Sequence, residues 1–204
     1  MILSSVIAGV LISGLIYAFT GFTIFGGTQR KAIVVEDAAN AELVMLAYNV
    51  LGYIRDDDFS ALSNIVHPEL GVVLSPYATI DLTTDRHYSA EQISTIDTDT
   101  IVYVWGVRNG GGEPIQMTPA EYLIEFVPAA EHMYAPVLGI NQIVRSGNAL
   151  ENLTTVFPNV KFVDFHIPGG EPIEEFDWSS LRLGFEEYED SLKLVVIAYS
   201  KWAG

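Results

Sequence analysis

Cysteine is absent from this chain of 204 residues. Its absence excludes disulfide bonds, thiolate nucleophiles, cysteine-ligated zinc and a lipid anchor on a cysteine side chain. A domain formed by residues 30–204 is large enough to bury a hydrophobic core without disulfides or a structural metal. We therefore predict a single domain over these residues that is held together by packing, and we predict no cofactor.

Basic residues are also scarce. The sequence has 10 Lys and Arg residues against 26 Asp and Glu residues, which gives a formal net charge of −16. A surface this acidic repels the phosphate backbone of nucleic acids and the headgroups of anionic lipids. The charge balance therefore predicts that the protein has no nucleic-acid partner.

Charge of either sign is missing from the first 27 residues. A secretory signal peptide has a basic start and an apolar run of about 7–15 residues, but this run lacks the basic start and is longer. A membrane-spanning helix needs about 20 apolar residues, which the segment supplies. Arg30 and Lys31 follow it, as basic residues do at a membrane interface. We predict that residues 1–29 form a single transmembrane anchor helix, with cleavage of the segment as the alternative.

Small residues recur every four positions in the predicted anchor, at Ser5, Gly9 and Ser13. This spacing places them on one helix face, where small side chains let membrane helices approach closely. The predicted partner of the segment is therefore the lipid bilayer, with self-association through the helix as an alternative that the small residues leave open. Arg30 and Lys31 lie on the domain side, which by the positive-inside rule favours a cytoplasmic domain.

The remaining sequence alternates helical and strand patterns. Apolar residues at helical spacing predict a helix within residues 34–58, and Asp56, Asp57 and Asp58 offer an N-cap for a shorter helix over residues 59–66. A capping box at Thr118 and Glu121 predicts a third helix over residues 118–127. A helical turn is predicted at 89–93, and strands at 71–80, 100–107, 159–167, 180–190 and 191–202. This order predicts an α+β fold with two or three helices on a mainly antiparallel curved sheet.

Four stretches of the sequence resemble an uncharacterised family of bacterial envelope lipoproteins and exported proteins. They are DFSALSNIVHPELGVVLSPYATID, YVWGVRNGGGEPIQMTPAEYLIEFV, GINQIVRSGNALENL and VKFVDFHIPG, and the resemblance spans about residues 56–202. It implies a cone-like domain similar to nuclear transport factor, tethered on the outer side of a membrane. Because two basic residues are a weak signal, we let the resemblance decide the orientation and predict an extracytoplasmic domain. The family often has a lipobox cysteine, in place of which this chain has its apolar segment. Because the family has no known activity, the resemblance assigns no functional residues.

One pair of ionisable residues has the spacing of an acid–base site. Asp164 and His166 are two residues apart in a predicted strand, so their side chains lie on the same face. Val163, Phe165 and Ile167 make the opposite face the predicted core side, which leaves the pair in solvent. Exposed side chains titrate near their usual pKa values, about 3.9 for Asp and about 6.5 for His. We therefore predict that the pair is not catalytic, and an acid–base dyad is the alternative.

The other histidines offer weaker signals. His67 ends the predicted second helix, where it would line a pocket or, as the simpler interpretation, cap the helix carbonyls. His87 and His132 have no partner at the spacing of metal ligands. We predict no metal site.

Aromatic residues gather in two places. Tyr103 and Trp105 lie on one face of a predicted strand, and Tyr199 and Trp202 lie close to the C-terminus. Aromatic rings with polar tips are typical of pocket mouths and interaction surfaces. We predict that these four residues form a ligand-binding or interaction surface, with plain core packing as the alternative.

The sequence therefore favours a membrane-anchored, extracytoplasmic binding or scaffolding module without catalytic activity, whose partner is an envelope protein or a small ligand. One alternative is a cone-fold enzyme that uses a carboxylate and a histidine inside a pocket. A second alternative is a filament subunit that packs through its apolar N-terminal helix. An open pocket behind Tyr103 and Trp105 would favour the enzyme, and a filled one would favour the binding module.

Overall fold

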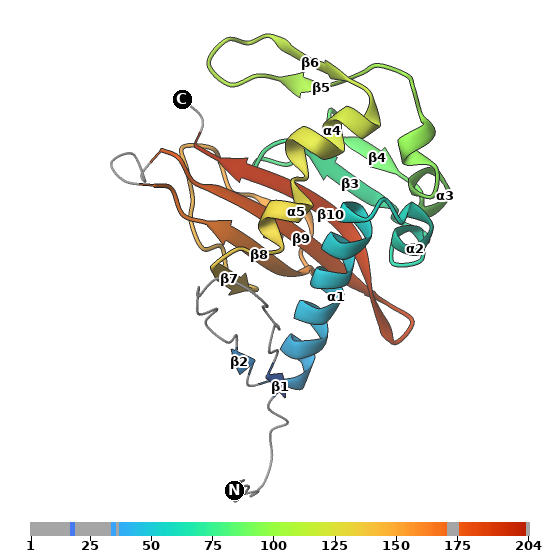
Figure 1. Cartoon of the computed structure of the whole chain (residues 1–204), viewed down its shortest axis with the longest axis vertical. Helices are drawn as coiled ribbons and strands as arrows, with labels where there is room; N and C mark the ends of the chain where they lie inside the picture. The colour runs from blue at the N-terminus through green and yellow to red at the C-terminus, as the bar shows by residue number, and fades with distance from the viewer. Residues whose placement is uncertain (1–16, 19–33, 36, 171–175, 203–204) are drawn as a thin grey trace, which may run out of the picture. The chain divides into compact units, whose positions relative to one another are not determined.

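The computed structural model describes residues 17–18, 34–35, 37–170 and 176–202 (Figure 1). The chain divides into two units, residues 1–42 and residues 43–204. In the first unit, β1 (Tyr17–Ala18) pairs with β2 (Val34–Val35) as antiparallel strands. The remainder of the predicted anchor, including Ser5, Gly9 and Ser13, lies outside the described residues, so the transmembrane helix stays a prediction. No helix in the described ranges is both long and apolar enough to cross a bilayer.

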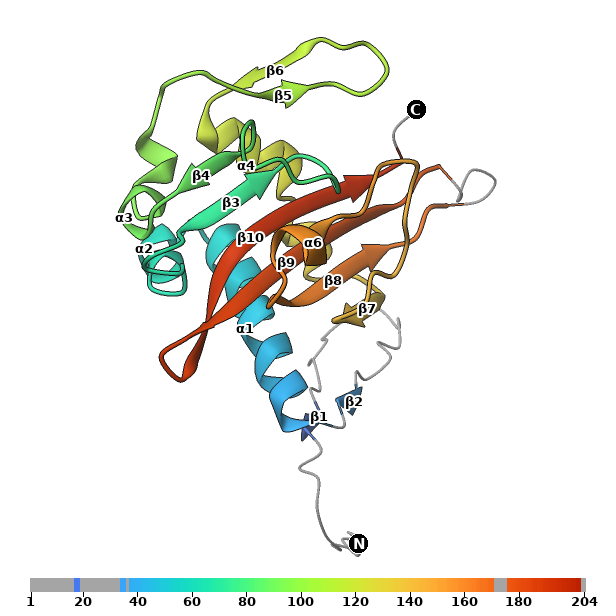
Figure 2. The same ribbon diagram turned by 180° about the vertical axis from the view of Figure 1, so that it is seen from behind.

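The second unit contains a mixed sheet of six strands. These strands are β3 (Val72–Ser75), β4 (Arg86–Tyr88), β7 (Val137–Ile140), β8 (Lys161–Ile167), β9 (Ser179–Tyr188) and β10 (Ser191–Lys201). Their order in the sheet is β4-β3-β10-β9-β8-β7 (Figures 1 and 2). The pair β3–β10 is parallel, and the other four neighbouring pairs are antiparallel. The predicted α+β class is confirmed.

Side-chain caps mark the start of three of the described helices. They are α1 (Ala38–Arg55), α2 (Phe59–Ser63), α3 (Ala90–Ile93), α4 (Pro119–Phe126), α5 (Ala129–His132), α6 (Leu153–Val156) and a 3-10 turn (Ile96–Thr98). The Asp58 carboxylate accepts a hydrogen bond from the backbone N–H of Ala61 at 3.0 Å and caps α2. Thr118 and Glu121 form the predicted capping box of α4. Local caps in the sequence therefore set the starts of α2 and α4.

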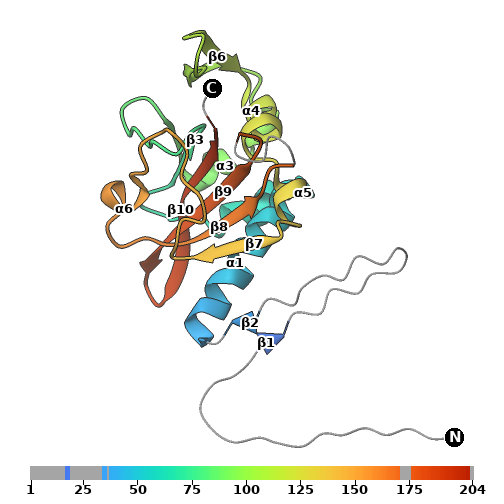
Figure 3. The ribbon, with the colours of Figure 1, turned by 90° about the vertical axis from the view of Figure 1, so that its left-hand side faces the viewer.

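Both faces of the sheet are covered. In the second unit, α1 from Leu43 onward, α4 and α5 cover one face, and α6 with the connection 141–160 covers the other (Figures 2 and 3). On the first face the ring of Tyr48 meets the edge of Phe165 at 5.2 Å. On the second face a core cluster comprises Val73, Ile80, Leu153, Phe162, Val195, Val196 and Ala198. Strands β8 and β9 are therefore buried on both sides.

Gly184 in β9 shows how closely the second face is packed. A Cβ atom at this position would collide with the side chains of Val196 and Val160. The glycine lets the segment around α6 approach the sheet, so we attribute its place in the strand to this contact.

A separate hairpin stands at one end of the unit. Its strands are β5 (Tyr103–Val107) and β6 (Pro114–Met117), and it lies beyond α4 in the side view of Figure 3. Its inner side chains, Trp105, Ile115 and Met117, are buried. Its outer side chains include Val104, which is 52% exposed. The hairpin is therefore stabilised from one side only.

Candidate functional site

Asp164 and His166 lie on one face of β8, as predicted, but that face is not open to solvent. Asp164 is 0% exposed and His166 is 4% exposed. The prediction of exposure was wrong because the connection 141–160 covers the second face of the sheet. Val163 and Phe165 point to the other face and are buried there, as predicted.

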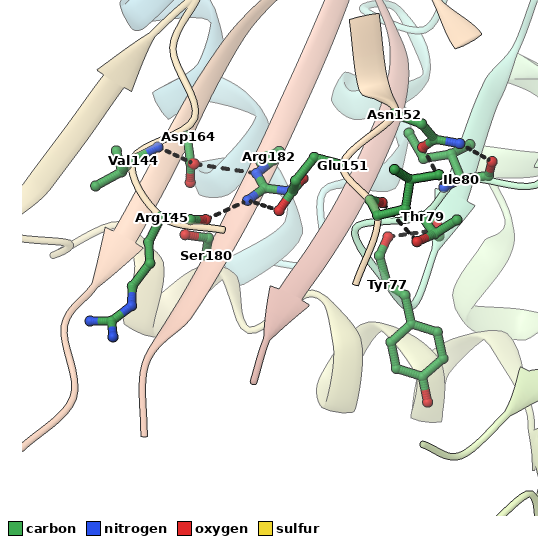
Figure 4. A network of polar contacts seen from close by, with 12 residues as sticks. Tyr77, Thr79, Ile80, Val144, Arg145, Glu151, Asn152, Asp164, Ser180 and Arg182 are labelled. Atoms are coloured by element: carbon green, nitrogen blue, oxygen red, sulfur yellow. Dashed lines mark hydrogen bonds and ion pairs between the residues drawn. The ribbon is translucent and has the colours of Figure 1, made fainter. Parts of the chain in front are cut away.

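The buried charge of Asp164 is neutralised by Arg182, its register partner on β9. The Arg182 guanidinium donates through Nε to Asp164 Oδ2 at 3.2 Å, and both of its Nη atoms donate to the Glu151 carboxylate (Figure 4). Nη2 also donates to the backbone carbonyl of Arg145 at 3.1 Å. A buried charge is tolerated only when it is paired and hydrogen-bonded in this way. The three charged groups therefore form one enclosed network.

The same network fastens residues 141–152 to the sheet, and we call this segment the cover loop. Near its start, the backbone N–H of Val144 donates to Asp164 Oδ2 at 3.0 Å. At its end, the Asn152 amide exchanges two hydrogen bonds of 2.8 Å with the backbone of Ile80 (Figure 4). Thr79 Oγ1 donates to the Leu150 carbonyl at 2.7 Å. The polar side chains of this region therefore hold the cover loop in place.

His166 is enclosed beside the network. Its Nδ1 atom lies 2.9 Å from the hydroxyl oxygen of Ser180, and its ring lies 5.8 Å from that of Trp178. Burial lowers the pKa of His166, and the nearby Asp164 charge opposes this effect only in part. The prediction of an ordinary histidine pKa was therefore wrong. An imidazole oriented as a base by a carboxylate would have its pKa raised instead.

The buried histidines make stability depend on pH. Burial also lowers the pKa of His132. Below about pH 6.5 the unfolded chain binds protons that these folded imidazoles do not, so the free energy of unfolding falls as the pH falls. Burial raises the pKa of Glu151. Its contribution to the free energy of unfolding therefore falls as the pH rises, which is opposite in sign to that of the histidines and occurs at more acidic pH. We expect the decrease in the free energy of unfolding between about pH 7 and about pH 5.5 to be smaller in His166→Gln than in the unsubstituted protein.

Urea unfolding of the full chain, followed by tryptophan fluorescence at several pH values, measures this difference. His87→Gln is the matched control, because His87 is exposed on β4. An unchanged slope in His166→Gln would contradict the assignment of a buried neutral imidazole.

His67 has a structural role, although not the predicted one. It is buried, and its Nδ1 atom accepts hydrogen bonds from the backbone N–H groups of Glu69 at 3.2 Å and Leu70 at 3.0 Å. Its ring packs edge-on against Tyr188 at 5.0 Å. The predicted cap on the helix carbonyls was wrong because the ring nitrogen accepts hydrogen bonds from the turn that follows.

The predicted aromatic surface is partly interior. Trp105 is 1% exposed, its ring stacks on Tyr122 with centroids 3.8 Å apart, and its Nε1 donates to the Met117 carbonyl at 2.9 Å. The space behind it is therefore filled by rings. Tyr103 is half-buried and donates its hydroxyl to Asp99 at 2.9 Å.

The two C-terminal aromatics lie elsewhere. Tyr199 is half-buried and meets the edges of Phe126 at 6.2 Å and His132 at 6.1 Å. Trp202 packs against Phe176 at 5.0 Å. The structure therefore keeps Tyr103 and Trp105 edge to face, with ring centroids 6.5 Å apart, and places Tyr199 and Trp202 against other rings. An interaction role for Tyr103, Tyr199 and Trp202 stays a prediction.

An apolar groove of about 360 Å³ lies on the side of the unit that carries α4 and α5. Its walls come from the end of α1, the start of α2, α4 and α5. The apolar lining includes Ile54, Phe59, Leu123, Ile124, Val127 and Ala129. Ile124 is 80% exposed, although it sits in the amphipathic helix α4. An isoleucine in an amphipathic helix does not by itself indicate a groove, because the groove also depends on where the neighbouring helices lie.

Three carboxylates also line the groove, at Asp57, Asp97 and Glu131. None of them forms an ion pair with another described residue. The groove's cation, Arg55, donates two hydrogen bonds to the adjacent Asp56, at 2.7 and 2.6 Å. The groove therefore combines an apolar wall with unneutralised negative charge.

Comparisons with known proteins do not assign the chain to a group. No family model matches it, and neither a curated protein nor a solved structure does. The resemblance to envelope lipoproteins and to the nuclear-transport-factor cone therefore stays a prediction from the sequence.

Proposed function

We propose that this protein is a membrane-anchored, extracytoplasmic binding or scaffolding module of the cell envelope, and that the apolar groove receives its protein partner. The observation that carries the proposal is the contrast between enclosed reactive groups and an open apolar surface. The proposed anchor is the uncharged segment at residues 1–29, and the proposed side of the membrane follows from the family resemblance.

The enclosed groups argue against the enzyme alternative. A general base must come within hydrogen-bond reach of its substrate. Asp164 and His166 lie beneath the cover loop, and Oδ2 of Asp164 already accepts hydrogen bonds from Arg182 and Val144. Ser180, the hydroxyl beside His166, is also fully buried. These contacts support a stabilising role for the cluster.

The shape of the groove favours a protein partner over a small ligand. Small-molecule sites bury about 70–90% of the ligand surface inside a cleft or cavity. Here Ile124 lines the groove and still exposes 80% of its surface. A partner that lies across the groove would cover this side chain and gain the free energy of its burial. The filament alternative depends on the apolar segment, which lies outside the described residues.

Photo-crosslinking in cells that express the full chain tests the proposal. We expect a photoreactive amino acid at Ala130, an exposed position in the groove, to give one discrete adduct that sediments with the membranes. The matched control is the same group at Thr154, which is exposed on α6 on the opposite face of the sheet (Figure 3). A soluble chain contradicts the anchor. Equal labelling at both positions, or none at 130, contradicts the binding surface.

A further inference from the structure

We infer that the partner presents a cationic amphipathic helix to the groove, with apolar side chains on one face and Lys or Arg beside them. This inference rests on the proposed function, because it names the chemistry of the partner at the same surface. It follows from the lining, the size and the charge of the groove.

The apolar wall sets the first requirement. Part of this wall is formed by side chains that are otherwise buried in the fold, at Leu123, Val127 and Ala129. Ile124 adds an exposed apolar side chain. A volume of about 360 Å³ is at the lower end of ligand pockets, so it takes a few large side chains rather than a whole domain. An amphipathic helix supplies such a row at positions i, i+3 and i+4. The groove is therefore matched to one face of a helix.

The carboxylates set the second requirement. Asp57, Asp97 and Glu131 come from three separate elements, the α1–α2 turn, the 3-10 turn and α5, and they meet at one groove. They remain unpaired within the described parts of the chain. A partner with basic residues beside its apolar face would neutralise them, whereas an acidic partner would be repelled.

The net charge of the protein acts in the same direction. A formal charge of −16 attracts a basic segment from a distance and raises its rate of association. Arg55 does not reverse the sign of the groove, because the adjacent Asp56 holds its guanidinium through two hydrogen bonds. The local and the global charge therefore favour the same partner.

Synthetic helical peptides test the inference directly. The full chain is placed in nanodiscs of zwitterionic lipid, with empty nanodiscs as the blank, and binding is followed by fluorescence anisotropy. The first probe has leucines on one face and lysines beside them, the second has glutamates in place of the lysines, and the third has serines in place of the leucines. We expect the first probe to bind at least about tenfold more tightly than either of the others. Its affinity should fall as salt is added.

Variants of the chain locate the binding. The triple change Asp57→Asn, Asp97→Asn and Glu131→Gln should weaken the first probe about tenfold. Asn tolerates the left-handed backbone of Asp57, whose φ is 55°. Ala130→Trp, which fills the groove from an exposed position, should weaken the probe by a similar factor. The control is Glu187→Gln, Glu189→Gln and Asp190→Asn near the β9–β10 turn, which removes the same charge and should leave the affinity unchanged.

The outcomes separate this inference from the proposed function. Equal binding of the serine probe, or equal loss in the control triple variant, would overturn the inference, because charge alone would then explain the binding. A stronger signal from the glutamate probe would overturn it as well. If an adduct forms at position 130 in cells but the lysine probe does not bind, the proposed function stands and the inference of a cationic helix is contradicted. Absence of the adduct and of binding by the lysine probe would contradict both the proposed function and this inference.

Discussion

Arg182→Met is expected to lower the free energy of unfolding by about 3–5 kcal/mol. Methionine removes the guanidinium but leaves Asp164 fully buried, where its remaining partner is the backbone N–H of Val144. Glu151 is less affected, because its side chain is 13% exposed and can turn towards water. The cost therefore comes mainly from one uncompensated buried carboxylate.

The double variant Arg182→Met with Asp164→Leu is the matched control. It removes both charges, and replacing a buried ion pair with apolar side chains of similar size is often close to neutral. We expect it to recover most of the stability that the single variant loses. Urea unfolding of the full chain measures both variants. A loss below about 1 kcal/mol in Arg182→Met would show that the network contributes little.

Trp105→Ala is expected to cost about 3–5 kcal/mol, the range for removing a buried aromatic side chain. The indole stacks on Tyr122 at 3.8 Å and lies 6.1 Å from Tyr88 in a nearly parallel arrangement. The substitution also leaves the Met117 carbonyl without the indole N–H as its donor. Because the hairpin is packed from one side only, we expect it to detach from α4 when this residue is lost.

Val104→Ala provides the comparison within the same strand. Val104 precedes Trp105, points to the outer face of the hairpin and is 52% exposed. Its truncation should change the free energy of unfolding by less than about 0.5 kcal/mol. Thermal unfolding of both variants separates the two faces of the hairpin. Equal losses would mean that the outer face is also covered in the protein.

Part of the local structure was predictable from the sequence, whereas β4, β6, β7, α5 and α6 were not predicted. The helix over residues 38–55, the N-cap at Asp58 and the capping box at Thr118 and Glu121 depend on neighbours within a few positions. The strand that carries Phe165 and the two strands at 180–190 and 191–202 were also predicted, because alternation and turn residues are local signals. The inner face of β8 was correctly predicted to be core.

The sequence by itself determined the α+β class, the acidic charge and the uncharged N-terminal segment. Only the tertiary structure decided what Asp164 and His166 face, because alternation in a strand tells which side chains share a side but not which segment covers them. Arg182 and Glu151, which enclose Asp164, are 18 and 13 positions from it along the chain, and no pattern of spacing reveals the ion pair. The groove likewise depends on packing, because Asp57, Asp97 and Glu131 meet only when three distant elements are brought together.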